Sequence, residues 1–191
     1  MVAVLAVFGI YLYEEAESPT LKTEKSESNE LDRSFQKMGI AQLASTEPLS
    51  EIAFQDLDGR TVKLSEFKGK IVLLNFWTTW CAACRDEMPQ MEKLYNRFKD
   101  RDFAMLAVDL QESAELVREF FTEYKLSFTA LLDSEGKARG LFGVGSIPTT
   151  LILDKEGRVV GAAVGSREWD SKQSFALFER LINEADAPPA R

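Results

Sequence analysis

Residues 71–89 read IVLLNFWTTWCAACRDEMP, and this stretch decides the fold. Its first seven residues form an almost continuous apolar run, which is typical of a β-strand buried on both faces of a sheet. From the cysteines to about residue 99, apolar residues recur at helical spacing. The stretch therefore predicts a buried strand that runs directly into a helix, with both cysteines at the junction.

The two cysteines of the chain, Cys81 and Cys84, are the candidate reactive groups. The N-terminus of a helix carries partial positive charge and unpaired N–H groups, which favour a thiolate over a thiol. A separation of three residues places both side chains on one helix face, close enough to form a disulfide. We expect Cys81 to be the attacking thiolate and Cys84, one turn further in and more buried, to be the resolving thiol. Two structural cysteines, or half of a zinc site shared with a second copy, are the alternatives.

Strands and helices alternate outward from this stretch. Before it, IAFQDLDGRTVKL indicates a hairpin around Asp58-Gly59. After it, we expect strands over 103–110 and 128–133, a helix over 113–126, a hairpin of strands over 149–154 and 158–165, and a closing helix over 171–185. This order predicts an α/β fold, with a mixed central sheet flanked by helices and an N-terminal β-hairpin extension.

Composition excludes several classes of function. The chain has 191 residues, of which 45% are apolar and 28% charged, as in ordinary globular proteins. Its net charge of −8 disfavours binding to a phosphate backbone, so we expect no nucleic-acid partner. It has no histidine, which removes His-dependent metal sites and the Ser-His-Asp and Cys-His arrangements. We therefore expect no metal and no cofactor besides the cysteine pair.

The first 46 residues differ from the rest in composition. Residues 1–13, MVAVLAVFGIYLY, carry no charge and would reach about 20 Å as a helix, short of the ~30 Å core of a bilayer. We interpret them as part of a membrane anchor, although a helix packed on the domain is the alternative. No Lys or Arg occurs before Lys22, which favours an extracytoplasmic location for the chain beyond the anchor. Residues 14–46 predict a polar, charged linker, and residues 47–187 a single domain.

The segment FWTTWCAACRDEMP resembles the active site of the thioredoxin superfamily, and more narrowly of its TlpA/ResA-like branch of membrane-tethered thiol–disulfide oxidoreductases. The similarity extends over residues 47–187 and includes the SIPTT segment and both hairpins. It implies a thioredoxin-like fold in which Pro89 kinks the helix and Ile147-Pro148 contains a cis-proline that faces the disulfide. Taken by itself, Pro148 also fits an ordinary proline at the start of a strand.

Two features depart from thioredoxins proper. Those proteins carry a buried Asp on the strand before the motif, where this chain has Asn75, an amide that cannot exchange a proton. The TlpA/ResA-like branch has a glutamate three residues after the second cysteine, which corresponds to Glu87, on the same helix face as Cys84. The resemblance implies that Glu87 handles the proton of Cys84, but the spacing equally fits a solvent-facing glutamate that complements the helix dipole. Between the cysteines, Ala82 and Ala83 offer no stabilising group, so we expect a reducing or intermediate potential.

Together these features predict a disulfide reductase at the cell membrane, with its catalytic domain on the periplasmic or outer face. Trp80, Ile147 and Pro148 are expected to form the surface that contacts the disulfide of a client. The resemblance implies a disulfide-bearing client protein, with the cysteines of apocytochrome c during cytochrome c maturation as a candidate. It also implies a transmembrane thiol electron donor.

Two other functions are compatible with parts of the sequence. A peroxiredoxin-like thiol peroxidase requires the segment Pro-x-x-x-Thr/Ser-x-x-Cys, in which Thr78 fits but Leu74 occupies the proline position. A non-catalytic, tethered binding domain would be indicated by cysteines that thiol reagents cannot reach.

Overall fold

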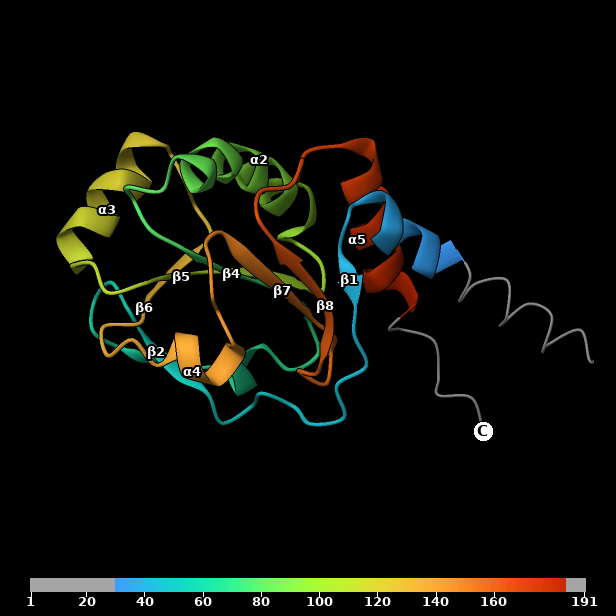
Figure 1. Ribbon diagram of the computed structural model, residues 1–191, viewed down its shortest axis with the longest axis horizontal. Coiled ribbons are helices and arrows are strands. Elements are labelled where there is room, and N and C mark those ends of the chain that lie inside the picture. The colour runs from blue at the N-terminus through green and yellow to red at the C-terminus, as the bar shows by residue number, and fades with distance from the viewer. Residues whose placement is uncertain (1–29, 185–191) are drawn as a thin grey trace, which may run out of the picture.

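The computed structural model describes residues 30–184. These residues fold into a mixed sheet with helices on both faces (Figure 1). The eight strands are β1 (Ala41–Gln42), β2 (Ala53–Asp56), β3 (Thr61–Lys63), β4 (Ile71–Trp77), β5 (Phe103–Asp109), β6 (Thr129–Leu132), β7 (Thr149–Leu153) and β8 (Val159–Val164). The helices are η1 (Leu64–Phe67), α2 (Ala82–Phe98), α3 (Ala114–Glu123), α4 (Ala138–Phe142) and α5 (Lys172–Glu184), with a further helical segment over 30–37. The strand order is β1-β8-β7-β4-β5-β6-β2-β3.

Strand β4 lies at the centre of the sheet, parallel to β5 and antiparallel to β7. Its seven residues are all buried, because side chains that alternate between the faces of the sheet enter two separate cores. Leu73 and Trp77 join the core that contains the buried residues of α2, α3 and α5. Leu74 and Phe76 join a second core with residues of α4 and the β2–β3 hairpin. This double burial explains the continuous apolar run of the sequence.

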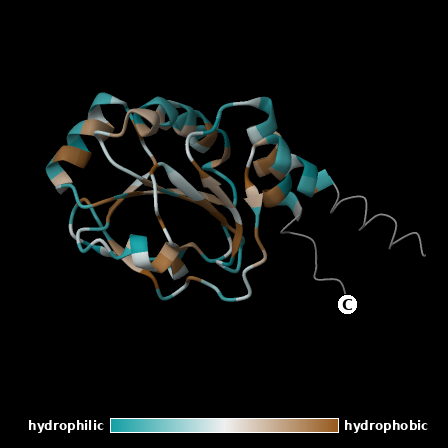
Figure 2. Cartoon of the chain, in the orientation of Figure 1, coloured by the Kyte–Doolittle hydropathy of each residue, from teal (hydrophilic) through white to brown (hydrophobic). Residues whose placement is uncertain are grey.

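The fold class expected from the sequence is confirmed, including the hairpin before β4 and the mixed strand directions. The helices alternate between hydrophobic and hydrophilic residues along their length, as their packing on the sheet requires (Figure 2). Helix α4 was not expected from the sequence. Its five residues are too few for a helical period to stand out, and only Ala138 is fully buried.

The N-terminal segment over 30–42 differs from the linker expected there. Within it, Phe35 is 1% exposed, Met38 and Ile40 are also buried, and β1 pairs antiparallel with β8. The segment fits because β8 has a glycine beneath it: a Cβ atom on Gly161 would lie 2.7 Å from the Phe35 ring. A few well-placed apolar residues therefore hold a polar stretch against the sheet.

Two further expectations concern residues that the structure does not describe. The anchor assigned to residues 1–13 lies outside the described range, as does the linker up to residue 29. None of the helices within residues 30–184 combines the length and hydropathy needed to cross a bilayer.

Truncation of Phe35 tests whether the N-terminal segment belongs to the folded domain. We expect Phe35→Ala to lower the free energy of unfolding by about 3–5 kcal/mol, because it leaves a cavity in the core. Leu43→Ala, just after the same segment but 43% exposed, should change it by only about 0.5 kcal/mol. Urea unfolding followed by tryptophan fluorescence measures both. If both variants lowered the free energy of unfolding by the same small amount, residues 30–42 would belong to the linker and not to the folded domain.

Candidate active site

The cysteine pair lies where β4 ends and α2 begins. Cys81 and Cys84 are joined in a disulfide with a Cα–Cα distance of 5.2 Å. Cys81 is the N-cap of α2, and its Sγ accepts a hydrogen bond of 3.2 Å from the main-chain N–H of Cys84. Cys81 is 8% exposed and Cys84 is fully buried, so an incoming disulfide would meet Cys81 first. These positions agree with the roles expected for the two thiols.

The loop before β7 lies beside this junction. The peptide bond Ile147–Pro148 is cis, as the resemblance implies. Because Thr149 pairs with Phe76 on β4, the strand register places Pro148 next to the end of β4, from which the chain continues into the cysteine motif. The carbonyl of Pro148 accepts a 2.8 Å hydrogen bond from Gly165, which ties the loop to the end of β8.

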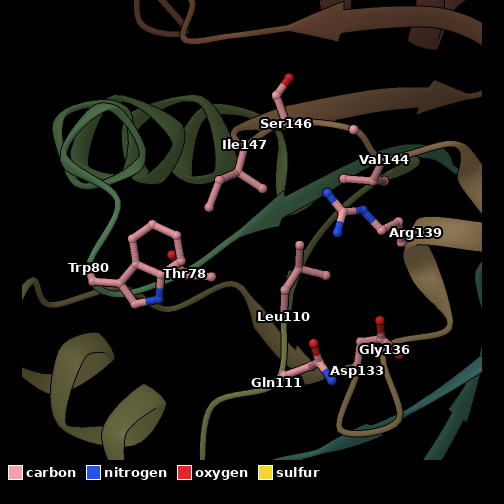
Figure 3. Close-up of a pocket in the computed structure, with 11 residues that line it drawn as sticks. Thr78, Trp80, Leu110, Gln111, Asp133, Gly136, Arg139, Val144, Ser146 and Ile147 are labelled. Atoms are coloured by element: carbon pink, nitrogen blue, oxygen red, sulfur yellow. The ribbon is translucent and has the colours of Figure 1, made fainter.

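Trp80 is 72% exposed and lines two hollows in the surface. The first has a volume of about 340 Å³, and Figure 3 shows Trp80 and Ile147 on its walls, with Arg139 reaching in from α4. The second is lined by Arg85 and Tyr124 among others. An exposed indole beside a reactive cysteine offers apolar contact area to a polypeptide, in keeping with the contact surface expected from the sequence. The neighbouring Trp77 is fully buried and only packs in the core.

Glu87 is fully buried on α2, one helical turn after Cys84, so the solvent-facing alternative is wrong. Its carboxylate accepts hydrogen bonds from β4 and from the loop between β8 and α5. Asn75 Nδ2 on β4 donates at 3.1 Å, Trp169 Nε1 at 2.9 Å and the main-chain N–H of Arg167 at 3.2 Å. Asn75 also donates to Thr150 Oγ1 on β7 at 2.9 Å. The amide on β4 therefore positions the carboxylate and exchanges no proton itself.

Burial raises the pKa of Glu87 above its ordinary value. Hydrogen bonds from Trp169, the Arg167 main chain, Asn75 and Ser166 act in the opposite direction without cancelling the effect of burial. A carboxylate with a raised pKa is a better-matched proton acceptor near neutral pH than an exposed one. Its place on the same helix face as Cys84 suits it to receive the proton of that thiol.

Apart from Glu87, a pair of carboxyl groups supports the loop before the cysteines. Glu112 accepts two hydrogen bonds of 2.6 Å from Thr79, one from the main-chain N–H and one from the hydroxyl. Asp109, fully buried at the end of β5, accepts a 2.8 Å hydrogen bond from the main-chain N–H of Glu112. The two carboxyl groups therefore lie close together behind Thr79-Trp80.

The pKa values of Asp109 and Glu112 are shifted in opposite directions. Burial and the hydrogen bond to Glu112 raise the pKa of Asp109 to about 8. Burial also acts to raise the pKa of Glu112, but hydrogen bonds from Asp109 and Thr79 outweigh it and lower that pKa. At neutral pH, Asp109 holds the proton and Glu112 carries the charge.

The sequence indicated Cys81, Cys84 and Glu87, and the structure brings them together at the start of α2. Sequence reasoning missed the groups that bind Glu87 and support the loop, namely Trp169, the Arg167 main chain, Asp109 and Glu112. One signal was present: Asp109 ends the apolar run of β5, and Glu112 lies three residues further on. Since β5 proves parallel to β4, the carboxyl ends of the two strands meet at one edge of the sheet. Within residues 30–184, no His, Cys, Asp or Glu side chains gather in threes that could hold a metal ion.

A thioredoxin-type sheet with a cysteine pair at a helix N-terminus and a cis-proline beside it defines the class of thiol–disulfide oxidoreductases. The model of the AhpC/TSA family matches residues 45–162. Thiol-disulfide oxidoreductase ResA of Bacillus thuringiensis (strain Al Hakam) is 38% identical over 120 residues, which are 63% of this chain and 69% of that protein. ResA of Halalkalibacterium halodurans is 34% identical over 151 residues, or 79% and 80%. The chain belongs to the AhpC/TSA family, among thiol–disulfide oxidoreductases similar to ResA.

Solved structures support the same conclusion. A putative thiol:disulfide interchange protein DsbE from Chlorobium tepidum superposes with a TM-score of 0.64 at 29% identity, covering 75% of this chain and 99% of that one. The thioredoxin domain of a thiol-disulfide oxidoreductase from Bacteroides vulgatus has a TM-score of 0.63 at 28% identity, covering 74% and 99%. The expected enzyme class is confirmed: the protein is a thiol–disulfide oxidoreductase.

Asp109→Asn should make the stability of the oxidised protein less sensitive to alkaline pH. The pKa of Asp109 is about 8 in the folded state and about 4 in the unfolded chain. Between these two pH values, the folded wild type therefore binds more protons than the unfolded chain. Its free energy of unfolding falls as the pH rises through this range. Asn keeps an oxygen for the Glu112 N–H and can donate to its carboxylate. Relative to wild type, the variant should gain on the order of 2–3 kcal/mol between pH 6 and pH 9.

Urea unfolding at both pH values measures this difference. A stability difference that stays the same at pH 6 and pH 9 would show that Asp109 does not hold a proton in the folded state.

Proposed function

We propose that this oxidoreductase works as a disulfide reductase on client proteins outside the cytoplasm. In the dithiol form, the Cys81 thiolate attacks a client disulfide, forms a mixed disulfide and releases one client sulfur as a thiolate that takes up a proton. Cys84 then gives its proton to Glu87 and attacks the Cys81 sulfur. This step releases the second client thiolate, which is protonated in turn, and leaves the Cys81–Cys84 disulfide. The client gains two electrons and two protons, and a thiol donor must restore the dithiol.

The single observation that carries this proposal is the buried carboxylate beside the buried cysteine. Cys84 has no exposed surface, and a low-dielectric site disfavours its thiolate, so solvent is poorly placed to take its proton. Glu87, equally buried and one turn away, supplies an acceptor inside the same core. Resolution of a mixed disulfide therefore has a dedicated proton acceptor, which supports complete two-cysteine turnover rather than simple binding.

Location and client form the finer part of the proposal. The uncharged segment 1–13 and the acidic residues after it favour a membrane anchor with the domain on the extracytoplasmic face. An anchored reductase of this kind requires a transmembrane thiol donor, and the cysteines of apocytochrome c are the client that the resemblance suggests. Recovery of the full chain in the soluble cytoplasmic fraction of cells would contradict this placement.

The reduction potential of the Cys81/Cys84 couple tests the direction of the reaction. Because Ala82 and Ala83 provide no charge or donor to a thiolate, we expect a potential well below the roughly −120 mV of strong thiol oxidants. Equilibration in dithiothreitol and glutathione buffers, with alkylation of free thiols, measures it. A value near −120 mV would exclude the reductase. Hydrogen peroxide consumption faster than disulfide reduction, with dithiothreitol as donor, would favour the thiol peroxidase instead.

Glu87→Gln should slow the second step of the reaction and spare the first. With Ellman's reagent as the disulfide, the reduced protein releases one coloured thiolate when Cys81 attacks and a second when Cys84 resolves the mixed disulfide. Glutamine keeps the shape but cannot accept a proton, so we expect the second phase at pH 7 to be about 10-fold slower or more. Stopped-flow absorbance resolves both phases.

Three controls frame this experiment. Cys84→Ser should retain the first phase alone, and Cys81→Ser should abolish rapid reaction. Glu92→Gln makes the same change of charge further along α2 and should leave both phases as in wild type. Unchanged second-phase rates in Glu87→Gln would remove Glu87 from the proton pathway.

A further inference from the structure

The loop between β8 and α5 contacts the site at two points. Its Gly165 N–H donates to the carbonyl of Pro148, and its Arg167 N–H donates to the carboxylate of Glu87. Two residues further on, Trp169 places its indole N–H on the same carboxylate oxygen. The Ser166 side chain in the same loop also donates to Glu87, so the position of this loop sets three of the four donors around the carboxylate.

The Arg167 side chain holds this loop in place. Its Nε and Nη2 both donate to the carbonyl of Gly39 in the N-terminal segment, at 3.2 and 2.7 Å. Its Nη1 donates to the carbonyls of Val164, Gly165 and Ser166 at 3.2, 3.1 and 2.9 Å. One guanidinium thus joins the N-terminal segment to the turn that carries the donors.

The backbone on both sides is shaped to receive this guanidinium. Gly39 and Gly165 adopt φ angles of +62° and +84°, a region that residues with a Cβ atom rarely occupy. A Cβ atom on Gly39 would lie 3.4 Å from Arg167 Nε. All five hydrogen bonds of the guanidinium go to main-chain carbonyls, so its planar fork works here as a structural link between two segments.

We propose that Arg167 is a positioning residue for the resolving step: by linking the Gly39 carbonyl to the carbonyls of residues 164–166, it holds the Arg167 N–H and the Trp169 indole on the Glu87 carboxylate. The N-terminal segment is then part of the redox site, although it contacts neither cysteine in a hydrogen bond. This inference rests on the proposed role of Glu87.

Loss of the link should change the protonation of Glu87. The groups that donate to this carboxylate, namely Asn75, Ser166, the Arg167 main chain and Trp169, are all neutral, and Cys84 on the same helix is the titratable group one turn away. Burial raises the pKa of Glu87, and the hydrogen bonds from Trp169 and the Arg167 main chain oppose that rise. A looser loop weakens both bonds, so less of Glu87 is ionised at neutral pH.

The test uses the reduced full-length protein and the second phase of its reaction with Ellman's reagent, measured from pH 5.5 to 9. In Arg167→Ala, we expect the pH profile of this phase to move up by about one unit, with the first phase unchanged. Arg167→Lys keeps the charge, but its single nitrogen cannot bind both groups of carbonyls, so a clear part of the shift should remain. Arg180→Ala removes the ion pair from α5 to Glu30 on the same N-terminal segment and should not move the profile.

A double variant decides whether the effect passes through the carboxylate. In a Glu87→Gln background, Arg167→Ala should cause no further slowing, because no proton acceptor remains to be positioned. Equal slowing in both backgrounds would overturn the proposal, and so would an unchanged profile in Arg167→Ala and Arg167→Lys while Glu87→Gln still slows the reaction. If Glu87→Gln itself has no effect, the proposed proton pathway fails and Arg167 loses its role with it.

Discussion

The burial of one carboxylate governs the arrangement of this site. Glu87 has no exposed surface, and a buried carboxylate must replace its water with hydrogen bonds from the protein. Those bonds come from β4, from the turn after β8 and from the indole that precedes α5. Each donor must be held in turn, Asn75 by its neighbours in the sheet and the turn by Arg167. The requirement to satisfy one side chain therefore connects the centre of the sheet with the N-terminal segment.

Acidic side chains lie in two places around the cysteine motif, and each place forms one group. Glu87 lies inside the core beneath α2, and Asp109 with Glu112 lies behind Thr79, before the first cysteine. Both groups form at the carboxyl end of the central parallel strands, where chain segments from several strands converge. In the first group a carboxylate can receive a proton from Cys84. In the second, Asp109 keeps a proton so that Glu112 can remain charged and hold the loop.

Prediction from sequence was strongest where a pattern had both length and a chemical reason. The seven-residue apolar run of β4 identified a doubly buried strand, and the cysteine spacing identified the start of α2. It was weakest for short or polar pieces. The segment over 30–42 has few apolar residues, and its place in the fold depends on a glycine more than 100 positions away, at 161. Neither local composition nor periodicity contains that information.

The sequence by itself determined the class of fold and the reacting atoms, because hydrophobic periodicity and the Cys-x-x-Cys spacing are local properties of the chain. It also placed Glu87 on the helix face of Cys84. Only the tertiary structure decided that Glu87 is buried and not solvent-facing, and which groups bind it. The donors Asn75, Arg167 and Trp169 are separated from it by 12, 80 and 82 positions, so their contacts exist only once the sheet and helices have packed. A pKa depends on burial and partners, and both are properties of that packing.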